Sequence, residues 1–304
     1  MSILNTGRSV KKEISSLKKL HTQQNEELKL LIAKGLIKPL LGKTIQSLRE
    51  VEFKVFSQFG DDGIIQWLVN NLDIKNNVFI EFGVEDYEES NTRFLMINDN
   101  WSGLVMDASD KNVARIKNSD YHWRHDLQAK STFVTKENIN QLITEANLPS
   151  EIGLLHVDLD GNDYWVWDAI DSVDPTIFIG EYNSVFGETR PITIPYNPSF
   201  IRTEAHYSNL YFGASIKALH HLAAKKGYAF VGCNSAGNNA YFVKEEKLND
   251  VVKEVSLESG FVCSKFRESR NQQGELTYLS GGDRLAALKG LPVINVETGK
   301  TETL

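Results

Sequence analysis

The chain has 304 residues, a hydrophobic fraction of 41% and a formal net charge of −7, which are values of an ordinary globular protein. Its 33 Lys and Arg are outnumbered by 40 Asp and Glu, which argues against a nucleic-acid partner because phosphate contacts need a clustered basic surface. No apolar run reaches the ~18 residues of a membrane span, and the first residues lack the apolar core of a secretory signal. Two cysteines exclude a disulfide framework. We therefore expect a cytoplasmic protein without a membrane span.

Residues 1–42 are predicted to form a helical arm in front of the main domain. Five apolar residues follow alternating steps of four and three, the spacing of a coiled-coil seam: Val10, Ile14, Leu17, Leu28 and Leu31. His21 and Gln24 interrupt this stripe, and Gly35 with Pro39 ends it. Two interpretations remain open: a helix packed on its own domain, or a helix through which the chain forms a homo-oligomer.

From residue 57 onward, apolar segments alternate with helical ones. Strands are expected at 78–82, 103–107, 152–158 and 176–181, and helices at 86–98, 111–118, 136–147 and 164–172. This alternation predicts a mostly parallel sheet with helices on both faces. A helix at 213–226, followed by two apolar runs around the turn NSAGNN, predicts a C-terminal antiparallel hairpin. Residues 43–304 are expected to form one α/β domain, with an irregular extension at 265–304.

Acidic residues surround a single glycine where the first expected strand ends, in the sequence EFGVED. Ligands of doubly wound sheets bind at this edge, and a nicotinamide dinucleotide would need G-x-G-x-x-G there to hold its pyrophosphate. Only Gly83 is present, and Glu81 and Glu85 would suit a cationic ligand without a pyrophosphate, such as S-adenosylmethionine. Asp107 ends the second strand, where a carboxylate can accept both ribose hydroxyls. Asp126, taken to follow the third strand, is expected near the adenine.

These residues resemble the class I S-adenosylmethionine-dependent methyltransferases, and several stretches are similar to FkbM-type and related enzymes of polysaccharide and natural-product biosynthesis. The similar stretches include SQFGDDG at 57–63, DLDGNDYWVW at 158–167, EYNSVFG at 181–187 and GCNSAGNN at 232–239. The resemblance implies a seven-stranded Rossmann-like sheet and an O-methyltransferase that acts on a hydroxyl of a saccharide or glycan precursor. The residues expected to bind the cofactor are Gln58, Glu81, Gly83, Glu85, Asn91, Asp107, Ala108, Asp126 and Asp158. Gln58 and the acids after it could equally cap the following helix.

The fourth and fifth expected strands end in HVDLDGNDYW and GEYN. Carboxylate and amide oxygens from neighbouring strand ends suit a hard cation such as Mg²⁺, and the predicted ligands are Asp158, Asp160, Glu181 and Asn183. Catechol-type O-methyltransferases use a similar arrangement, but Tyr182 stands where that family has its second Asp. Hydrogen bonds to helix starts and substrate hydroxyls are therefore the alternative. The candidate bases for the acceptor proton are His156, Asp160 and His206.

Residues 190–215 form a long segment that contains three prolines, and such segments are usually lids or binding loops. Its aromatic and polar side chains suit a sugar. Two other functions are considered. A non-catalytic assembly protein, recruited through the N-terminal helix, would have no need of the acids at the strand ends. Glycoside hydrolysis would need two carboxylates at a fixed separation, which nothing in the sequence provides.

Overall fold

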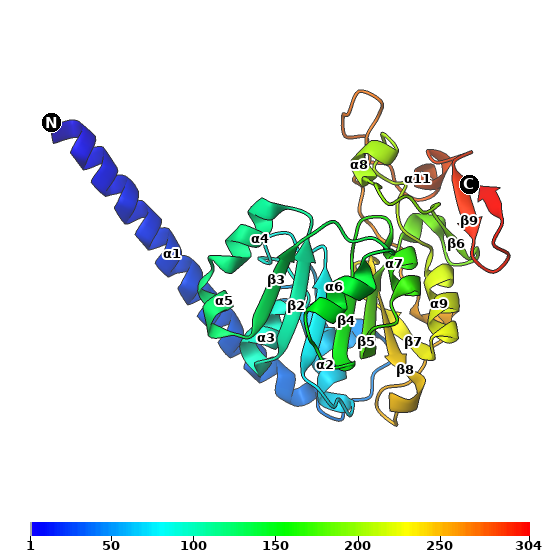
Figure 1. Cartoon of the computed structure of the whole chain (residues 1–304), viewed down its shortest axis with the longest axis horizontal. Coiled ribbons are helices and arrows are strands. Elements are labelled where there is room, and N and C mark those ends of the chain that lie inside the picture. The colour runs from blue at the N-terminus through cyan, green and yellow to red at the C-terminus, as the bar shows by residue number, and fades with distance from the viewer. Residues whose placement is uncertain (1) are drawn as a thin grey trace.

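The computed structural model describes the backbone of residues 2–304 and the side chains of residues 10–18 and 20–304 (Figure 1). The helices are α1 (Ser2–Ile37), α2 (Asp61–Asn71), α3 (Arg93–Asp99), α4 (Asp110–Lys117), α5 (Asp120–Arg124), α6 (Ile139–Glu145), α7 (Asp163–Ala169), α8 (Arg202–Ala205), α9 (Ile216–Lys225), α10 (Leu257–Gly260) and α11 (Gly282–Ala286). The strands are β1 (Val78–Phe82), β2 (Ser102–Asp107), β3 (Leu127–Ser131), β4 (Glu151–Val157), β5 (Asp174–Glu181), β6 (Ile192–Thr193), β7 (Tyr228–Cys233), β8 (Asn239–Lys244), β9 (Pro292–Asn295) and β10 (Thr301–Thr303).

Seven strands form the main sheet, in the order β3-β2-β1-β4-β5-β8-β7. The first five strands pair in parallel, whereas β8 is antiparallel to both of its neighbours, β5 and β7. The predicted mostly parallel seven-stranded sheet with a C-terminal hairpin is therefore confirmed. β1 pairs with both β2 and β4, so the strand order reverses there. In such sheets this reversal opens a crevice at the carboxyl ends of the strands.

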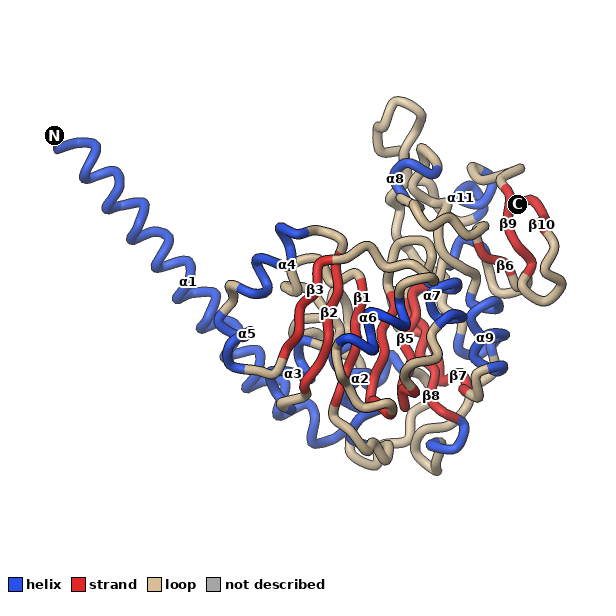
Figure 2. The backbone as a smooth tube through the Cα atoms, viewed as in Figure 1, coloured by secondary structure: helices blue, strands red, loops and turns tan. Residues whose placement is uncertain are grey.

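The central strands are buried on both faces, which explains why they are continuous apolar runs. Successive residues point to opposite faces, so Ile80 and Phe82 pack with side chains of α6, α7 and α9, whereas Phe79 packs with those of α2, α3 and α4. The helices thus lie on both sides of the sheet (Figure 2). On the first side, Trp167 of α7 stacks on Phe178 of β5 with ring centroids 3.6 Å apart. The two cores fix the carboxyl edge of the sheet in place.

Helix α1 extends away from the domain over most of its length (Figure 1). Its last turns contact the domain: Glu26 pairs with Arg93 at 2.9 Å, and Ala33 packs in a small cluster with Phe56 and Phe94. The apolar stripe predicted from the sequence is exposed, so it does not pack on its own domain. No helix in the described part of the chain, α1 included, combines the length and hydropathy that a membrane span requires.

The prediction that residues 265–304 are irregular is wrong in part. This segment contains α11, β9 and β10, and β9 pairs antiparallel with both β10 and β6 to make a second sheet. The strands are two to four residues long, too short for a periodic pattern to show in the sequence. Arg190 pairs with Glu302 at 2.7 Å, and Ile192, Leu288 and Val293 share a small core. The second sheet therefore fastens the C-terminal segment to residues 190–215.

Candidate functional site

A cavity of about 690 Å³ opens at the carboxyl edge of the main sheet, where β1, β2, β4 and β5 end. Its walls include eight of the nine predicted cofactor residues: Gln58, Glu81, Gly83, Glu85, Asn91, Asp107, Ala108 and Asp158. They also include His156, Asp160 and Glu181 from the predicted acceptor side. Asp126, Asn183 and His206 do not line this cavity. The structure thus brings most of the predicted site residues together at one edge of the sheet.

Glu81, at the end of β1, organises the loop that follows it. Its carboxylate accepts hydrogen bonds from the backbone N–H groups of Asn91 (2.9 Å) and Thr92 (3.1 Å), from the Ser90 hydroxyl (2.5 Å) and from the Thr92 hydroxyl. These bonds hold residues 90–92 as a loop, which is why α3 begins at Arg93 and the helix predicted from residue 86 starts later. Glu81 acts on the cavity through this loop.

His156 of β4 is paired at both ring nitrogens. Nδ1 lies 2.9 Å from Glu81 and Nε2 lies 3.2 Å from the side-chain amide of Asn91. Burial acts to lower the pKa of His156, but the hydrogen bond and charge of Glu81 outweigh burial, so the pKa of His156 is raised. Burial acts to raise the pKa of Glu81, but its hydrogen bonds and the charge of His156 outweigh burial, so the pKa of Glu81 is lowered. Because His156 is 4% exposed and both of its ring nitrogens are already paired, it is not free to take a proton from a substrate hydroxyl.

Gly83 is required by a close approach of two chain segments. Its φ is +70°, and a Cβ built on it would lie 1.7 Å from the carbonyl oxygen of Asp158. The loop after β1 and the loop after β4 therefore touch through backbone atoms alone. Any larger residue would push these two walls of the cavity apart.

Asp107, at the end of β2, holds the neighbouring loop as well as lining the cavity. Its Oδ2 accepts the N–H of Glu85 at 2.9 Å, and its Oδ1 accepts the N–H of Ser109 at 2.8 Å. Each carboxylate oxygen can accept two hydrogen bonds, so Oδ2 retains a position for a hydroxyl. Glu85 and Tyr87 have positive φ angles of 47° and 64°, which keeps the loop from continuing as a helix.

Asp126 lies at the other edge of the sheet, which corrects its predicted position. It immediately precedes β3, and its carbonyl oxygen accepts the N–H of Gly103 at the start of β2. The strand had been expected before Asp126, but residues 120–124 form the short helix α5. A residue at the amino edge of a parallel sheet is a strand length away from the cavity, so Asp126 cannot contact a ligand there.

The SQFGDDG stretch resolves into one cavity residue and two structural acids. Gln58 lines the cavity, whereas Oδ2 of Asp62 accepts three backbone N–H groups, from Val55, Phe56 and Ser57, at 2.7 to 2.8 Å. Asp61 accepts hydrogen bonds from Asn234 (2.9 Å) and Asn239 (3.1 Å) of the GCNSAGNN stretch. The stretches SQFGDDG and GCNSAGNN are therefore neighbours in space, and Asp61 and Asp62 shape the loop that carries Gln58.

Asp62 provides a test through the pH dependence of stability. Burial raises its pKa from 3.8 to about 6, so the folded state favours the protonated Asp62 carboxyl. This contribution to the free energy of unfolding is fully present below pH 3.8, the ordinary pKa of Asp, and is lost as the pH rises through 6. A shift of this size is worth about 3 kcal/mol in total, most of which is lost between pH 4 and pH 7. In Asp62→Asn we expect the free energy of unfolding, measured by urea denaturation, to fall less steeply over this range. The exposed Asp250→Asn is the control, and an unaltered slope in Asp62→Asn would contradict the assignment.

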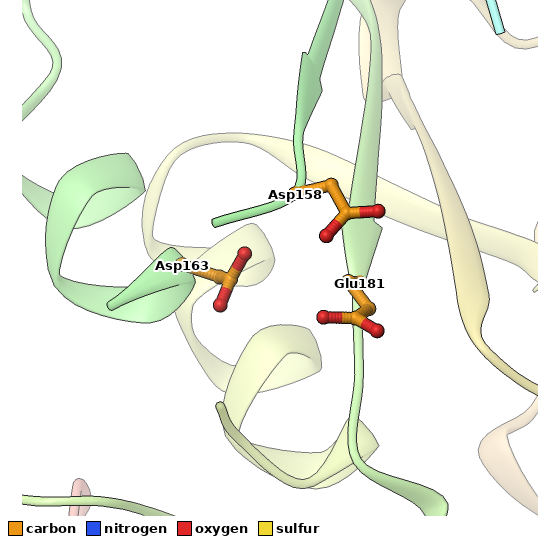
Figure 3. A group of neighbouring side chains, drawn as sticks. All are labelled: Asp158, Asp163 and Glu181. Atoms are coloured by element: carbon orange, nitrogen blue, oxygen red, sulfur yellow. The ribbon is translucent and has the colours of Figure 1, made fainter. Parts of the chain in front are cut away.

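Three carboxylates converge at the carboxyl ends of β4 and β5: Asp158 after β4, Asp163 at the start of α7 and Glu181 at the end of β5 (Figure 3). One oxygen from each lies within 4.8 Å of the others. Burial raises the pKa of Asp158 to about 7 and that of Asp163 to about 6, and burial together with Asp158 raises that of Glu181 well above its usual range. Oε2 of Glu181 is buried and has no hydrogen-bond partner in the described chain.

Two of the predicted cation ligands, Asn183 and Asp160, do not belong to this group of three carboxylates. The side-chain amide of Asn183 donates to the carbonyls of Leu210 (2.8 Å) and Phe212 (3.0 Å), and its oxygen accepts the N–H of Val185. Asn183 therefore fixes the long segment after β5. Asp160 has a φ of 52° and pairs with Arg202 at 2.5 Å; it is outside the group of three acids, although its charge contributes to raising their pKa values. The third carboxylate of the group is that of Asp163 instead of Asp160. The Asp163 carboxylate also accepts N–H groups from the turn before α7.

His206 does not lie where the prediction placed it. It follows α8, bonds Ser208 Oγ at 2.8 Å through Nδ1, and lines neither the main cavity nor the smaller one beside it. That second cavity, of about 330 Å³, shares Gln58, Glu181 and Arg202 with the first. Its walls include further residues that sequence reasoning missed: Phe59, Phe212, Phe266, Arg267 and Arg284. Three of these come from the segment after residue 260, in which no motif was found.

A scan of protein-family models and a search of curated proteins gave no match to this chain. Among solved structures, an O-methyltransferase from Bacillus cereus in complex with SAH is similar at 14% identity, over 55% of this chain and 74% of that one, with a TM-score of 0.33. M. capricolum TrmK with S-adenosylhomocysteine matches at 10% identity, over 64% and 72% of the two chains, with a TM-score of 0.35. An S-adenosylmethionine-dependent methyltransferase from Clostridium acetobutylicum matches at 10% identity, over 60% of this chain and 88% of that one, with a TM-score of 0.35. The function is therefore inferred from the residues of this chain.

Proposed function

We propose that this protein is an S-adenosylmethionine-dependent methyltransferase that methylates a hydroxyl of a saccharide or glycan precursor. The observation that carries the proposal is the acid-lined cavity at the point where the strand order reverses, with Gly83 and Asp107 at the ends of adjacent strands. Acidic walls suit a cofactor that carries a sulfonium and an amino group and lacks a phosphate. When bound, the cofactor supplies an electrophilic methyl group.

The cofactor side would be divided between two loops. Asp107 would accept a ribose hydroxyl through the free position on Oδ2, while Glu85 and Asn91, which line the same cavity, would face the methionine part. Glu81 holds residues 90–92 in place through four donors of that loop. The loop is thus organised before a ligand arrives, which reduces the ordering cost of binding.

The acceptor side fits a hard divalent cation. Asp158, Asp163 and Glu181 would hold it, since three carboxylate oxygens within 4.8 Å of one another are the ligands that such ions prefer. The buried and unpaired Oε2 of Glu181 supports this, because a buried carboxylate oxygen without a partner is costly. A cation there would orient the acceptor hydroxyl and make it more acidic.

Asp160 is the proposed acceptor of the hydroxyl proton. Of the three bases considered from the sequence, it is the one that lines the cavity with an oxygen, Oδ2, that accepts no hydrogen bond within the described chain. Arg202 fixes the other oxygen from α8. Arg202 also lies over the Phe212 ring at 3.8 Å, so the long segment after β5 holds it firmly. Alignment of the acceptor oxygen with the methyl group is the remaining requirement.

A saccharide acceptor is supported by the second cavity, which opens beside the acids. Phe59 and Phe266 lie there with ring centroids 5.0 Å apart, and Arg202 and Asn238 add hydrogen-bond donors. Aromatic faces with neighbouring polar groups suit the apolar face and the hydroxyls of a sugar ring. We also propose that the chain self-associates through α1.

Binding of S-adenosylhomocysteine, measured by titration calorimetry, tests the proposed cofactor. We expect the wild-type protein to bind it, and Asp107→Asn to weaken binding about tenfold or more because a charge-assisted hydrogen bond is lost. Asp110→Asn is the matched control: Asp110 lies three residues away on α4, is exposed and does not line the cavity. Equal affinities for all three proteins would refute the ribose role of Asp107.

A wild-type protein that binds neither S-adenosylmethionine nor its product would favour a non-catalytic assembly function. If the cofactor binds, release of S-adenosylhomocysteine with a panel of saccharides tests the acceptor class. Release with none of the saccharides, but with a phenol or an amine, would leave the methyltransferase in place and refute the saccharide.

A further inference from the structure

The apolar stripe of α1 lies on the side of the helix that faces away from the domain. The docked face is centred on Ala33, which is 1% exposed, with Leu30 and Ile37 beside it. Each residue turns the helix by about 100°, so Leu31 and Leu28 lie about 200° and 140° from Ala33. The stripe is therefore open from Val10 to Leu31, and its five apolar residues are 47% to 66% exposed.

The stripe has the form of a coiled-coil seam with a polar centre. Steps of four and three carry it from Val10 through Ile14 and Leu17 to the polar pair His21 and Gln24. It then continues through Leu28 and Leu31 to Gly35. Leu20, Ile32 and Leu36, which are also exposed, flank this a/d seam and widen its apolar face. A seam of alternating a and d positions fits another helix of the same kind.

We propose that the seam binds α1 of a second copy of this chain, antiparallel, in the register that joins residue i to residue 45 − i of the partner. This pairs three layers of the seam with layers of matching polarity and places Val10 against the partner's Gly35. Leu17 meets the partner's Leu28, Ile14 meets the partner's Leu31, and His21 meets the partner's Gln24 at the centre. A two-fold symmetric contact requires such self-complementarity, since each pair then occurs twice.

Charge favours the antiparallel orientation over the parallel one. The first half of α1 exposes Lys11, Lys12 and Lys18 against one acid, Glu13, whereas in the second half Glu26 and Glu27 balance Lys29 and Lys34. A parallel pair would place the two lysine-rich halves side by side. In the antiparallel register each lysine-rich half lies along the charge-balanced half of the partner, and Glu13 flanks the partner's Lys34.

The proposal specifies the self-association proposed above and does not depend on methyl transfer. Its first test is the molecular mass in solution of the full-length protein, by sedimentation equilibrium. We expect the wild type to be dimeric, and Leu17→Glu, which buries a charge in an apolar layer, to be monomeric at the same concentration. Ser16→Glu, one residue away and off the seam, is the matched control and should remain dimeric. A monomeric wild type would overturn the proposal.

Disulfide cross-linking tests the register, in a Cys263→Ser background that removes the exposed thiol. Ile14→Cys with Leu31→Cys should give a covalent dimer on mild oxidation, and Ile14→Cys alone should not. Within one helix these positions are about 25 Å apart, too far to form a disulfide with each other. A cross-linked dimer from Ile14→Cys alone would show parallel pairing and overturn the register.

Two further measurements separate the alternatives. Binding of the wild type to phosphatidylserine-containing vesicles, together with a monomeric mass in solution, would assign the stripe to a membrane surface and refute the dimer. Calorimetric binding of S-adenosylhomocysteine is expected to be the same for wild type, Leu17→Glu and Ser16→Glu, which shows that the variants fold. Failure of the wild type to bind that ligand, with the dimer intact, would refute the proposed function and leave this proposal standing.

Discussion

Gly83→Ala is expected to lower the free energy of unfolding by about 2 to 5 kcal/mol and to abolish binding of S-adenosylhomocysteine. A left-handed backbone costs a residue with a Cβ about 1 to 2 kcal/mol, and forcing an extra carbon into a packed contact costs about 1 to 3 kcal/mol more. The new Cβ would lie 1.7 Å from the Asp158 carbonyl oxygen, so the loops after β1 and β4 must separate. Urea denaturation and titration calorimetry measure the two effects.

Gly299→Ala is the matched control for this experiment. Gly299 has the same φ, +70°, but a Cβ built on it has no atom within 4 Å. Only the cost of the left-handed backbone, about 1 to 2 kcal/mol, is expected there, and ligand affinity should be unchanged. If both variants lose the same stability and both still bind the ligand, the close approach at Gly83 does not shape the cavity.

Glu181→Gln is expected to weaken binding of Mn²⁺, used as the probe cation, by at least about tenfold, because one of three carboxylate ligands is replaced by a weaker amide. Titration followed by electron paramagnetic resonance measures the affinity without any acceptor. In metal-free buffer the same variant should melt at a higher temperature, since burial and the neighbouring Asp158 oppose the charge of Glu181.

Asp160→Asn distinguishes the ligand set proposed from the three converging acids from the one predicted from the sequence. Asp160 pairs with Arg202 and stands outside the three converging acids, so its substitution should change Mn²⁺ affinity by no more than about twofold. A loss as large as that of Glu181→Gln would restore Asp160 to the ligands. If the wild type binds no Mn²⁺, the acids serve the acceptor through hydrogen bonds.

The strands and the residues at their carboxyl ends could be predicted from the sequence because the central strands are buried on both faces. The run at 78–82 coincides with β1, and Gly83 and Asp107 follow β1 and end β2, where the cavity forms. A run that is apolar throughout has few alternatives to a central parallel strand. The position of the residue after it follows from the strand direction alone.

Features that depend on contacts between distant segments were missed. Asp126 was assigned to the wrong edge because β3 is half-exposed and less apolar than its neighbours, so its limits are poorly marked. The late start of α3 depends on the hydrogen bonds that Glu81 makes across the loop. Asp163 lies five residues after Asp158, but a turn and a helix start bring the two carboxylates together.

The second sheet has a consequence for the order in which the site can form. Residues 190–215, which carry Arg202, are fastened by β9 and by Glu302, both late in the sequence. Contacts between segments so far apart form slowly because a large loop must close first. The carboxyl ends of β1, β2 and β4 can therefore form on the nascent chain before residues 190–215 are fastened, whereas the loop that carries Gln58 also waits for Asn234 and Asn239. The part of the cavity that Arg202 lines is then among the last to be completed.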